Sequence, residues 1–205
     1  MDTQYYPITK PIRTTAPTPA QEPVTLAEAK RQQVGIAEGI DHFDDEIQRN
    51  ISTARALVEN DTGLVCYTGT YTWKFTEWPC ESWFEIPAIR PVTSITSITY
   101  VDGSGVTQTW SASKYVLETS TVVPVVRLAY AESWPGDIRG DINGITVTMI
   151  AGYASVLTVP DGIKKAVLLL VNHWFENKGI VGNVGPDIGM TYDALVSSFR
   201  RPSYP

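Results

Sequence analysis

The sequence predicts an α+β protein in which an antiparallel β domain is inserted into a small helical domain. Three observations predict this class. Residues 24–63 carry apolar side chains at helical spacing, residues 64–157 change to an alternating, threonine-rich pattern, and residues 158–200 return to helical spacing. The two helical stretches are therefore expected to form one domain, built from an N-terminal helix hairpin and a long C-terminal helix.

The composition limits the classes of function. The chain has 205 residues, of which 43% are hydrophobic, so it can bury a sizeable core. Its net charge of −6 argues against a protein that holds nucleic acid through a basic surface, although DNA could pass an acidic wall without being held. The longest apolar run, 166–171, is far too short to span a bilayer, and we expect a soluble protein made in the cytosol. Cys66 and Cys80 are expected to be reduced thiols. A disulfide between them is an alternative only if their strands pair.

The N-terminal part is predicted to be an arm followed by a helix hairpin. Residues 1–23 hold five prolines and little apolar material, which is typical of an extended or disordered arm, and Tyr5, Tyr6 and Ile8 could dock this arm on a neighbour. Thr25 and Glu28 have the spacing of a capping box at the start of a helix over 26–36. Asp41 is expected to cap a second helix that ends at Gly63, and the apolar face of that helix comprises Phe43, Ile47, Ile51, Ala54 and Val58.

The middle of the chain is predicted to fold as a small sandwich or barrel. Strands are expected over 67–78, 92–100, 108–110, 115–117, 125–130 and 145–150, with a turn at 102–105. Prolines interrupt 86–91, so this stretch is expected to be an edge or a link.

The long helix over 161–178 is the clearest element of the sequence. Asp161 is expected at its N-cap and Gly179 just beyond its C-terminus. Its apolar residues cover nearly the whole circumference, so it must be covered on two sides, one of them by a second copy of the chain. A last short helix is expected over 191–199, with Ala194, Leu195 and Phe199 on one side, and residues 201–205 form a basic, extended tail.

Few residues could carry chemistry. His173 and Glu176 have the i, i+3 spacing of a shared metal site, but no further ligands have suitable spacing, so a structural hydrogen bond of His173 is the simpler interpretation. The acids at 41, 44, 45 and 46 fit helix capping better than a calcium loop. Six aromatic residues could form a platform for a sugar or a base, and core packing is the simpler alternative: Tyr71, Trp73, Phe75, Trp78, Trp83 and Phe84. We therefore expect no catalysis, no metal and no cofactor.

Several motifs, in order, resemble one known family. They are Val24-Thr25-Leu26-Ala27-Glu28-Ala29-Lys30, Asp44-Asp45-Glu46-Ile47, Ala54-Arg55-Ala56-Leu57-Val58-Glu59, Pro91-Val92-Thr93-Ser94-Ile95, Ala151-Gly152-Tyr153 and His173-Trp174-Phe175-Glu176-Asn177. Together they resemble the head–tail connector (adaptor, or head-completion) proteins of long-tailed bacteriophages, in the longer form with a β insert. The resemblance covers roughly residues 24–202, and the proline-rich arm departs from the family pattern.

The resemblance implies a structural protein of the virion. Members form a ring, usually of twelve copies, below the portal at the head–tail interface, where they extend the DNA channel and meet the tail or a stopper or tail-terminator protein. It implies a helical connector domain (24–63 and 158–200), an inserted β domain (64–157), assembly in the host cytoplasm and passage of DNA without specific binding. We expect the subunit interface to use Leu168, Leu169, Val171, Trp174 and Phe175, and the portal to be bound by Phe199, Arg200, Arg201 and Tyr204.

Two other functions stay open on the sequence. One is a monomeric, β-rich module that binds a ligand or a carbohydrate on the aromatic residues. The other is a metal-dependent enzyme that uses His173 and Glu176. A large cyclic oligomer would separate the connector from the module, and a metal analysis would test the enzyme.

Overall fold

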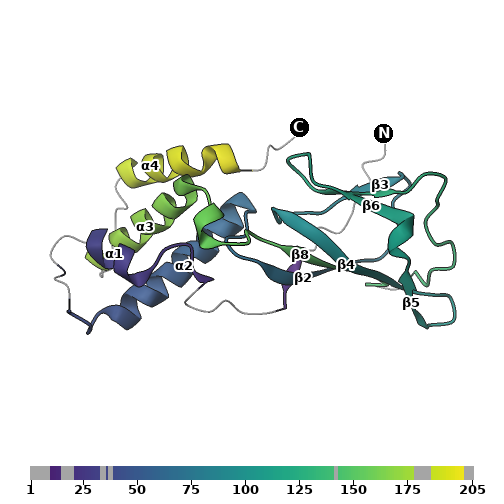
Figure 1. The fold of residues 1–205 in the computed structure, drawn as a ribbon, viewed down its shortest axis with the longest axis horizontal. Coiled ribbons are helices and arrows are strands. Elements are labelled where there is room, and N and C mark those ends of the chain that lie inside the picture. The colour runs from purple at the N-terminus through teal and green to yellow at the C-terminus, as the bar shows by residue number, and fades with distance from the viewer. Residues whose placement is uncertain are drawn as a thin grey trace. The chain divides into compact units, whose positions relative to one another are not determined.

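The protein folds as two compact units, and its class is α+β, as the sequence predicts. The computed structural model describes residues 10–14, 21–32, 36, 39–140, 143–177 and 186–200. Unit 1 comprises Met1–Ala16 and Thr68–Gly152, and unit 2 comprises Pro17–Tyr67 and Tyr153–Pro205 (Figure 1). Some residues with an expected role lie outside the described ranges: Tyr5, Tyr6, Ile8, Gly179, Arg201 and Tyr204.

Unit 2 contains the four α-helices of the described residues. They are α1 (Leu26–Gln32), α2 (Asp44–Thr62), α3 (Asp161–Glu176) and α4 (Pro186–Val196), with 3-10 turns at Val156–Thr158 and Ser197–Phe199. The central helix is α3, which contacts each of the other three (Figure 1). The buried core comes mainly from α2 and α3: Ile47, Ile51, Ala54, Val58, Ile163, Ala166, Val167, Leu170 and Val171.

The first two helices begin for different reasons. The capping box at α1 is confirmed, since the Glu28 carboxylate accepts from the Thr25 N–H at 2.7 Å and the Thr25 hydroxyl accepts from the Glu28 N–H at 3.1 Å. The expected cap of α2 is wrong, because Phe43 occupies the N-cap and α2 begins at Asp44. The Asp41 carboxylate instead lies 3.5 Å from Lys30 Nζ, which is 2.6 Å from Asp44. Gly63 ends α2 with a φ of 71°, a left-handed conformation that suits glycine.

Unit 1 is made of two antiparallel sheets. The larger has the order β1 (Ile12–Arg13), β2 (Gly69–Phe75), β8 (Ile145–Ala151), β4 (Val92–Val101) and β5 (Thr107–Trp110). The smaller has the order β3 (Trp83–Glu85), β7 (Val125–Leu128) and β6 (Tyr115–Glu118). Two separate sheets agree with the sandwich alternative rather than with a barrel.

The N-terminal arm contributes a strand that the sequence did not indicate. Ile12 pairs with Thr72 and Arg13 with Tyr71, and the Thr14 N–H donates to the Thr70 carbonyl at 3.0 Å. Proline-rich composition predicted an arm outside both domains, but two residues without proline are enough to pair along the edge of β2.

Aromatic side chains join the two sheets of unit 1. The Phe84 ring of β3 lies 5.8 Å from the Trp73 ring and 5.5 Å from the Phe75 ring of β2, measured between centroids. Trp110 of β5 stacks on Tyr115 of β6 at 5.2 Å. Four of the six aromatic residues considered as a ligand platform are buried: Tyr71, Trp73, Phe75 and Phe84. The platform interpretation is therefore wrong, because these rings form the core of unit 1.

The turn between β4 and β5 is organised by Asp102. Its carboxylate accepts from the Ser104 hydroxyl at 2.6 Å, from Gln108 Nε2 at 2.7 Å, and from the N–H groups of Val106 and Ser104 at 2.9 and 3.0 Å. These hydrogen bonds, led by those from the Ser104 and Gln108 side chains, lower the pKa of Asp102 from its ordinary value of 3.8 to about 2.

We expect acid to weaken unit 1 through Asp102. Because the folded pKa lies below the ordinary value, the stabilisation is complete above about pH 4 and is lost as the pH falls towards the folded value of about 2. Tryptophan fluorescence during thermal unfolding should show the Tm of the wild type falling more steeply between these pH values than that of Asp102→Asn. At neutral pH the variant should have the lower Tm. Equal slopes of Tm against pH in the two proteins over this range would contradict this prediction.

Candidate assembly surface

The most exposed face of α3 is polar, so the helix is not apolar all round. The exposed residues of the helix are Asp161, Lys165 and Glu176, and the half-buried Leu168 and Leu169 lie on the same side. Asp161 is also not the N-cap, because Pro160 holds that position and no side chain caps the helix. An acid in the first helical turn still favours the helix dipole, which explains why the start was misplaced by one residue.

The expected subunit interface divides into buried and half-buried residues. Val171 is only 1% exposed within its own subunit, so its inclusion in an interface was wrong. The other four are half-buried, and three of them, Leu168, Trp174 and Phe175, pack against the core of unit 2. Phe175 meets Phe43 edge to face at 5.2 Å. We refer to Leu168, Leu169, Trp174 and Phe175 as the α3 flank, the apolar residues of α3 that its own subunit covers only in part.

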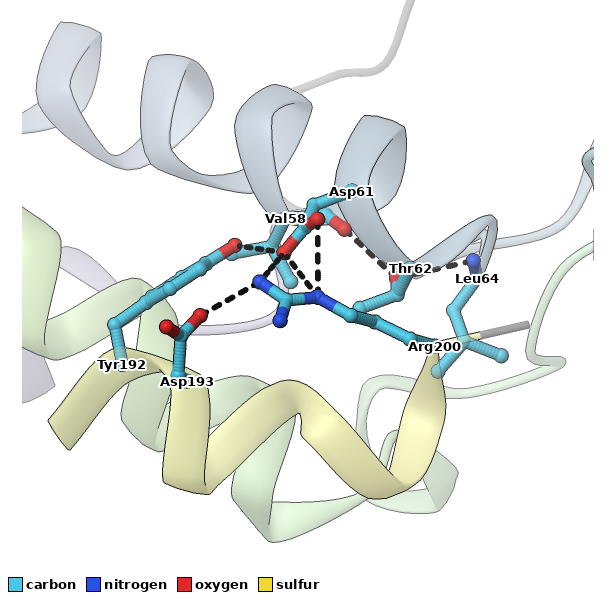
Figure 2. A network of polar contacts seen from close by, with 7 residues as sticks. All are labelled: Val58, Asp61, Thr62, Leu64, Tyr192, Asp193 and Arg200. Atoms are coloured by element: carbon cyan, nitrogen blue, oxygen red, sulfur yellow. Dashed lines mark hydrogen bonds and ion pairs between the residues drawn. The ribbon is translucent and has the colours of Figure 1, made fainter. Parts of the chain in front are cut away.

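A polar network attaches the C-terminal end of α4 to α2 (Figure 2). Arg200 Nη2 lies 2.9 Å from Asp61 Oδ2 and 2.7 Å from Asp193 Oδ1, and the Tyr192 hydroxyl donates to Asp61 at 3.1 Å. Hydrogen bonds to Asp61 and Asp193 raise the pKa of Arg200, and burial together with Asp61 raises that of Tyr192. Nearby, the Thr62 hydroxyl donates to the Val58 carbonyl at 2.7 Å and accepts from the Leu64 N–H at 3.1 Å.

Two residues expected to bind a portal are used within the subunit. Arg200 belongs to the network with Asp61 and Asp193, and Phe199 packs against the core of unit 2. The Phe199 ring comes so close to Gly162 that a Cβ there would lie 2.9 Å from it, so a side chain at position 162 would have to displace this ring. These contacts correct the expectation that both side chains are available to a partner.

Sequence reasoning also misjudged the buried face of α4. Ala194 is exposed, whereas Val196 is fully buried and Tyr192 and Leu195 pack against the core. One signal could have found the network. An acid such as Asp61 in the last turn of a helix opposes the helix dipole, and it is favourable there only when a cation pairs with it.

The residues considered for catalysis have ordinary partners. His173 Nδ1 lies 3.1 Å from Asn177 Nδ2, and Glu176 accepts from Asn172 Nδ2 at 3.2 Å. Within the described ranges, no group of three or more His, Cys, Asp and Glu residues is placed to hold a metal ion. Cys66 is buried and Cys80 is exposed, and neither forms a disulfide. The same part of the chain has no helix with the length and apolar character needed to cross a bilayer.

Comparison with known proteins identifies the fold. No protein-family profile and no curated protein sequence matches the chain. A chain in the neck of an empty GTA particle, computed with C6 symmetry, superposes with a TM-score of 0.77 at 21% identity, over 96% of this chain and 98% of the other. The chain has the fold of a gene transfer agent neck protein.

Two further structures carry the same neck-protein fold. One is the virion of a native gene transfer agent particle, with a TM-score of 0.78, and the other is the neck of a native GTA particle computed with C12 symmetry, with a TM-score of 0.72. Both are 21% identical to this chain and cover 96% of it, and 98% of each neighbour is covered in turn. The neck-protein fold thus includes both the helical and the β unit.

Proposed function

We propose that this chain is a structural protein of the neck of a phage or phage-like particle, without catalytic activity, and that it joins the head to the tail. The observation that carries the proposal is the fold, which matches a neck protein over 96% of this chain and 98% of the other. The buried aromatic cluster of unit 1 also supports a structural role over a ligand-binding module.

The protein is proposed to assemble as a ring of twelve copies below the portal. The sixfold and twelvefold symmetries applied to the neighbouring neck structures support a cyclic assembly. The α3 flank supplies apolar surface for one side of the contact between subunits. A ring with head-to-tail contacts needs a different surface on the other side. Unit 2 exposes three large apolar side chains that could provide it: Leu57, Leu157 and Met190.

The remaining partners follow from this position in the particle. The ring would contact the portal on one face and the tail, or a stopper or tail-terminator protein, on the other, after assembly in the host cytoplasm. A net charge of −6 suits a channel through which DNA passes without being held. Since Phe199 and Arg200 are engaged within the subunit, portal docking is now proposed for Arg201 and Tyr204 alone.

A charged substitution in the α3 flank tests whether these residues form the contact between subunits of the ring. Leu169→Glu should leave the subunit folded, because Leu169 is half-buried, but should abolish ring formation, because a carboxylate would be desolvated at the apolar contact. Native mass spectrometry and electron microscopy of the protein, with and without the portal, would measure assembly. Leu169→Met, which keeps an apolar side chain at the same position, is the matched control and should assemble normally.

The outcomes separate two claims. If Leu169→Glu formed normal rings, the α3 flank would not be part of the subunit interface, and the proposal of a ring would still hold. A wild-type protein that stays monomeric even with the portal would overturn the ring itself.

A further inference from the structure

The outer edge of β5 carries none of the features that usually protect the edge of a sheet. Among the described residues β5 is the last strand of the larger sheet, and residues 103–113 include no charged residue and no proline. Natural edge strands commonly carry charges or proline, because an unprotected edge pairs with other chains. The other edge strands of unit 1 follow this rule, since β1 follows Pro11, β3 includes Glu85 and β6 includes Glu118.

The main-chain groups of Thr107 and Thr109 point away from β4. The Asp102 N–H donates to the Val106 carbonyl at 2.9 Å, and hydrogen-bonded pairs alternate along an antiparallel ladder. Gln108 therefore bonds to its partner on β4, whereas the threonines on either side of it direct their N–H and carbonyl groups outwards. Such groups are what an extended segment binds when it adds a strand to a sheet.

β5 is held firmly in its own sheet. Its four residues pair with β4 without a shift of register. Gln108 Nε2 lies 2.7 Å from Asp102 Oδ2, and Trp110 is 6% exposed and stacks on Tyr115 at 5.2 Å. A rigid edge loses little conformational freedom when a strand adds to it, so β5 is suited to binding an extended segment.

The N-terminal arm has the length and composition of such a segment. Nine residues precede Lys10, and residues 3–9 carry no charge and are rich in residues that favour strands. The arm joins the larger sheet at β1, the edge opposite β5. Crossing its own sheet would span four strand spacings, about 19 Å, and would use about six of the nine residues, which leaves too few to pair with β5. The β5 edge of a neighbouring copy requires no such crossing.

The position of the proline in the arm fits this pairing. Pro7 has no N–H, so it can lie in an added strand only where its backbone faces away from the neighbouring strand. Tyr6 and Ile8 then face the edge, and their spacing of two residues is that of Thr107 and Thr109. Aromatic and β-branched residues are favourable partners for threonine across strands.

We propose that, in the ring, the N-terminal arm of one subunit adds as a strand to the β5 edge of the next subunit. Residues 3–9 bind there through the main chain of Tyr6 and Ile8. The arm joins one edge of the sheet and binds at the opposite edge, so the contact is head-to-tail and can repeat around a closed ring. This inference rests on the proposed ring and names the contact that unit 1 contributes to it.

Hydrogen exchange of the full-length protein tests the strand addition. The amides of Thr107 and Thr109 should exchange about tenfold or more slowly in the ring assembled with the portal than in the monomer, because the added strand accepts their hydrogen bonds. Ile8→Pro removes an N–H that faces the edge and should abolish this protection. Thr9→Pro removes an N–H that faces away, as Pro7 does, and is the matched control that should keep it.

Cross-linking identifies which chain occupies the edge. In a chain with Cys80→Ser, the pair Ile8→Cys and Thr107→Cys should give a ladder of linked subunits when the ring is treated with a short thiol cross-linker, because each arm is bound to the next copy. Ile8→Cys with Val116→Cys, on the protected edge strand β6, is the control and should give no ladder.

The outcomes distinguish this contact from the ring itself. Links within single chains would place the arm on its own subunit, and linked dimers of Thr107→Cys alone would indicate that two β5 edges pair, so either result would overturn the inference. Rings in which the Thr107 and Thr109 amides stay unprotected would overturn it while leaving the proposed function in place. A wild type that stays monomeric with the portal would overturn both.

Discussion

Arg55→Met is expected to lower the free energy of unfolding of unit 2 by about 3–5 kcal/mol, because it leaves two carboxylates buried without their cation. Glu22 and Glu59 both lose an ion pair with Arg55, at 2.8 and 2.6 Å. The single change is thus expected to be far more damaging than the triple variant Glu22→Gln, Arg55→Met and Glu59→Gln, which leaves no charge unpaired.

Circular dichroism at the helical minimum would measure this effect, since the α-helices of the described residues lie in unit 2. The two units have separate cores, so each transition should be followed with its own probe. Lys30→Met is the matched control, as it removes a cation from an ion pair nearer the surface, where the loss should be much smaller. Equal losses for Arg55→Met and Lys30→Met would contradict the assignment of Arg55 to a buried cluster.

Phe75→Ala is expected to destabilise unit 1 by about 3–5 kcal/mol, the usual effect of truncating a buried aromatic residue. Phe75 is 2% exposed and its ring contacts three other aromatic rings, those of Trp73, Trp78 and Phe84, at centroid distances of 4.5, 6.0 and 5.5 Å. The cavity would lie where the two sheets meet, so both sheets lose packing.

Tryptophan fluorescence is the appropriate probe, because five of the six tryptophans lie in unit 1. Trp83→Ala provides the comparison: Trp83 lies on β3, the next strand in the sequence, but is 36% exposed, so the loss of stability should be much smaller. The helical signal of unit 2 should be unchanged in both variants. If Phe75→Ala unfolded at the same denaturant concentration as Trp83→Ala, the aromatic cluster could not be the core.

The sequence predicted the elements better than their ends. Alternation of apolar and polar residues placed β8 over 145–150, and the structure has Ile145–Ala151. Helical spacing likewise identified the face of α2 that carries Ile47, Ile51 and Val58. Errors came where local chemistry was ambiguous: Asp41 and Asp161 both look like N-caps, but the helices begin three residues after Asp41 and at Asp161 itself.

Contacts between distant segments could not be predicted. The charge at Arg200 suggested an external partner, yet it pairs with Asp61, which lies 139 residues away. The pairing of β1 with β2 and that of Arg55 with Glu22 have the same character, since a single sequence carries no information about which distant residues meet. The partial burial of the α3 flank could not be predicted either, because the periodicity of apolar residues shows which way a side chain faces but not how much of its surface is buried.

The strand order of unit 1 has a consequence for synthesis on the ribosome. β1 is made first, but its partner β2 follows about sixty residues later, and β8, which lies between β2 and β4, comes after all other strands. α3, on which α1 and α2 pack, is made later still. At the usual rate of about 5–20 residues per second, apolar segments of both cores wait several seconds for the strand and the helix that cover them. Unit 1 is therefore expected to fold only after β8 has emerged, at about three quarters of the chain, and unit 2 only after α3 has followed, and nascent chains are expected to depend on chaperones until then.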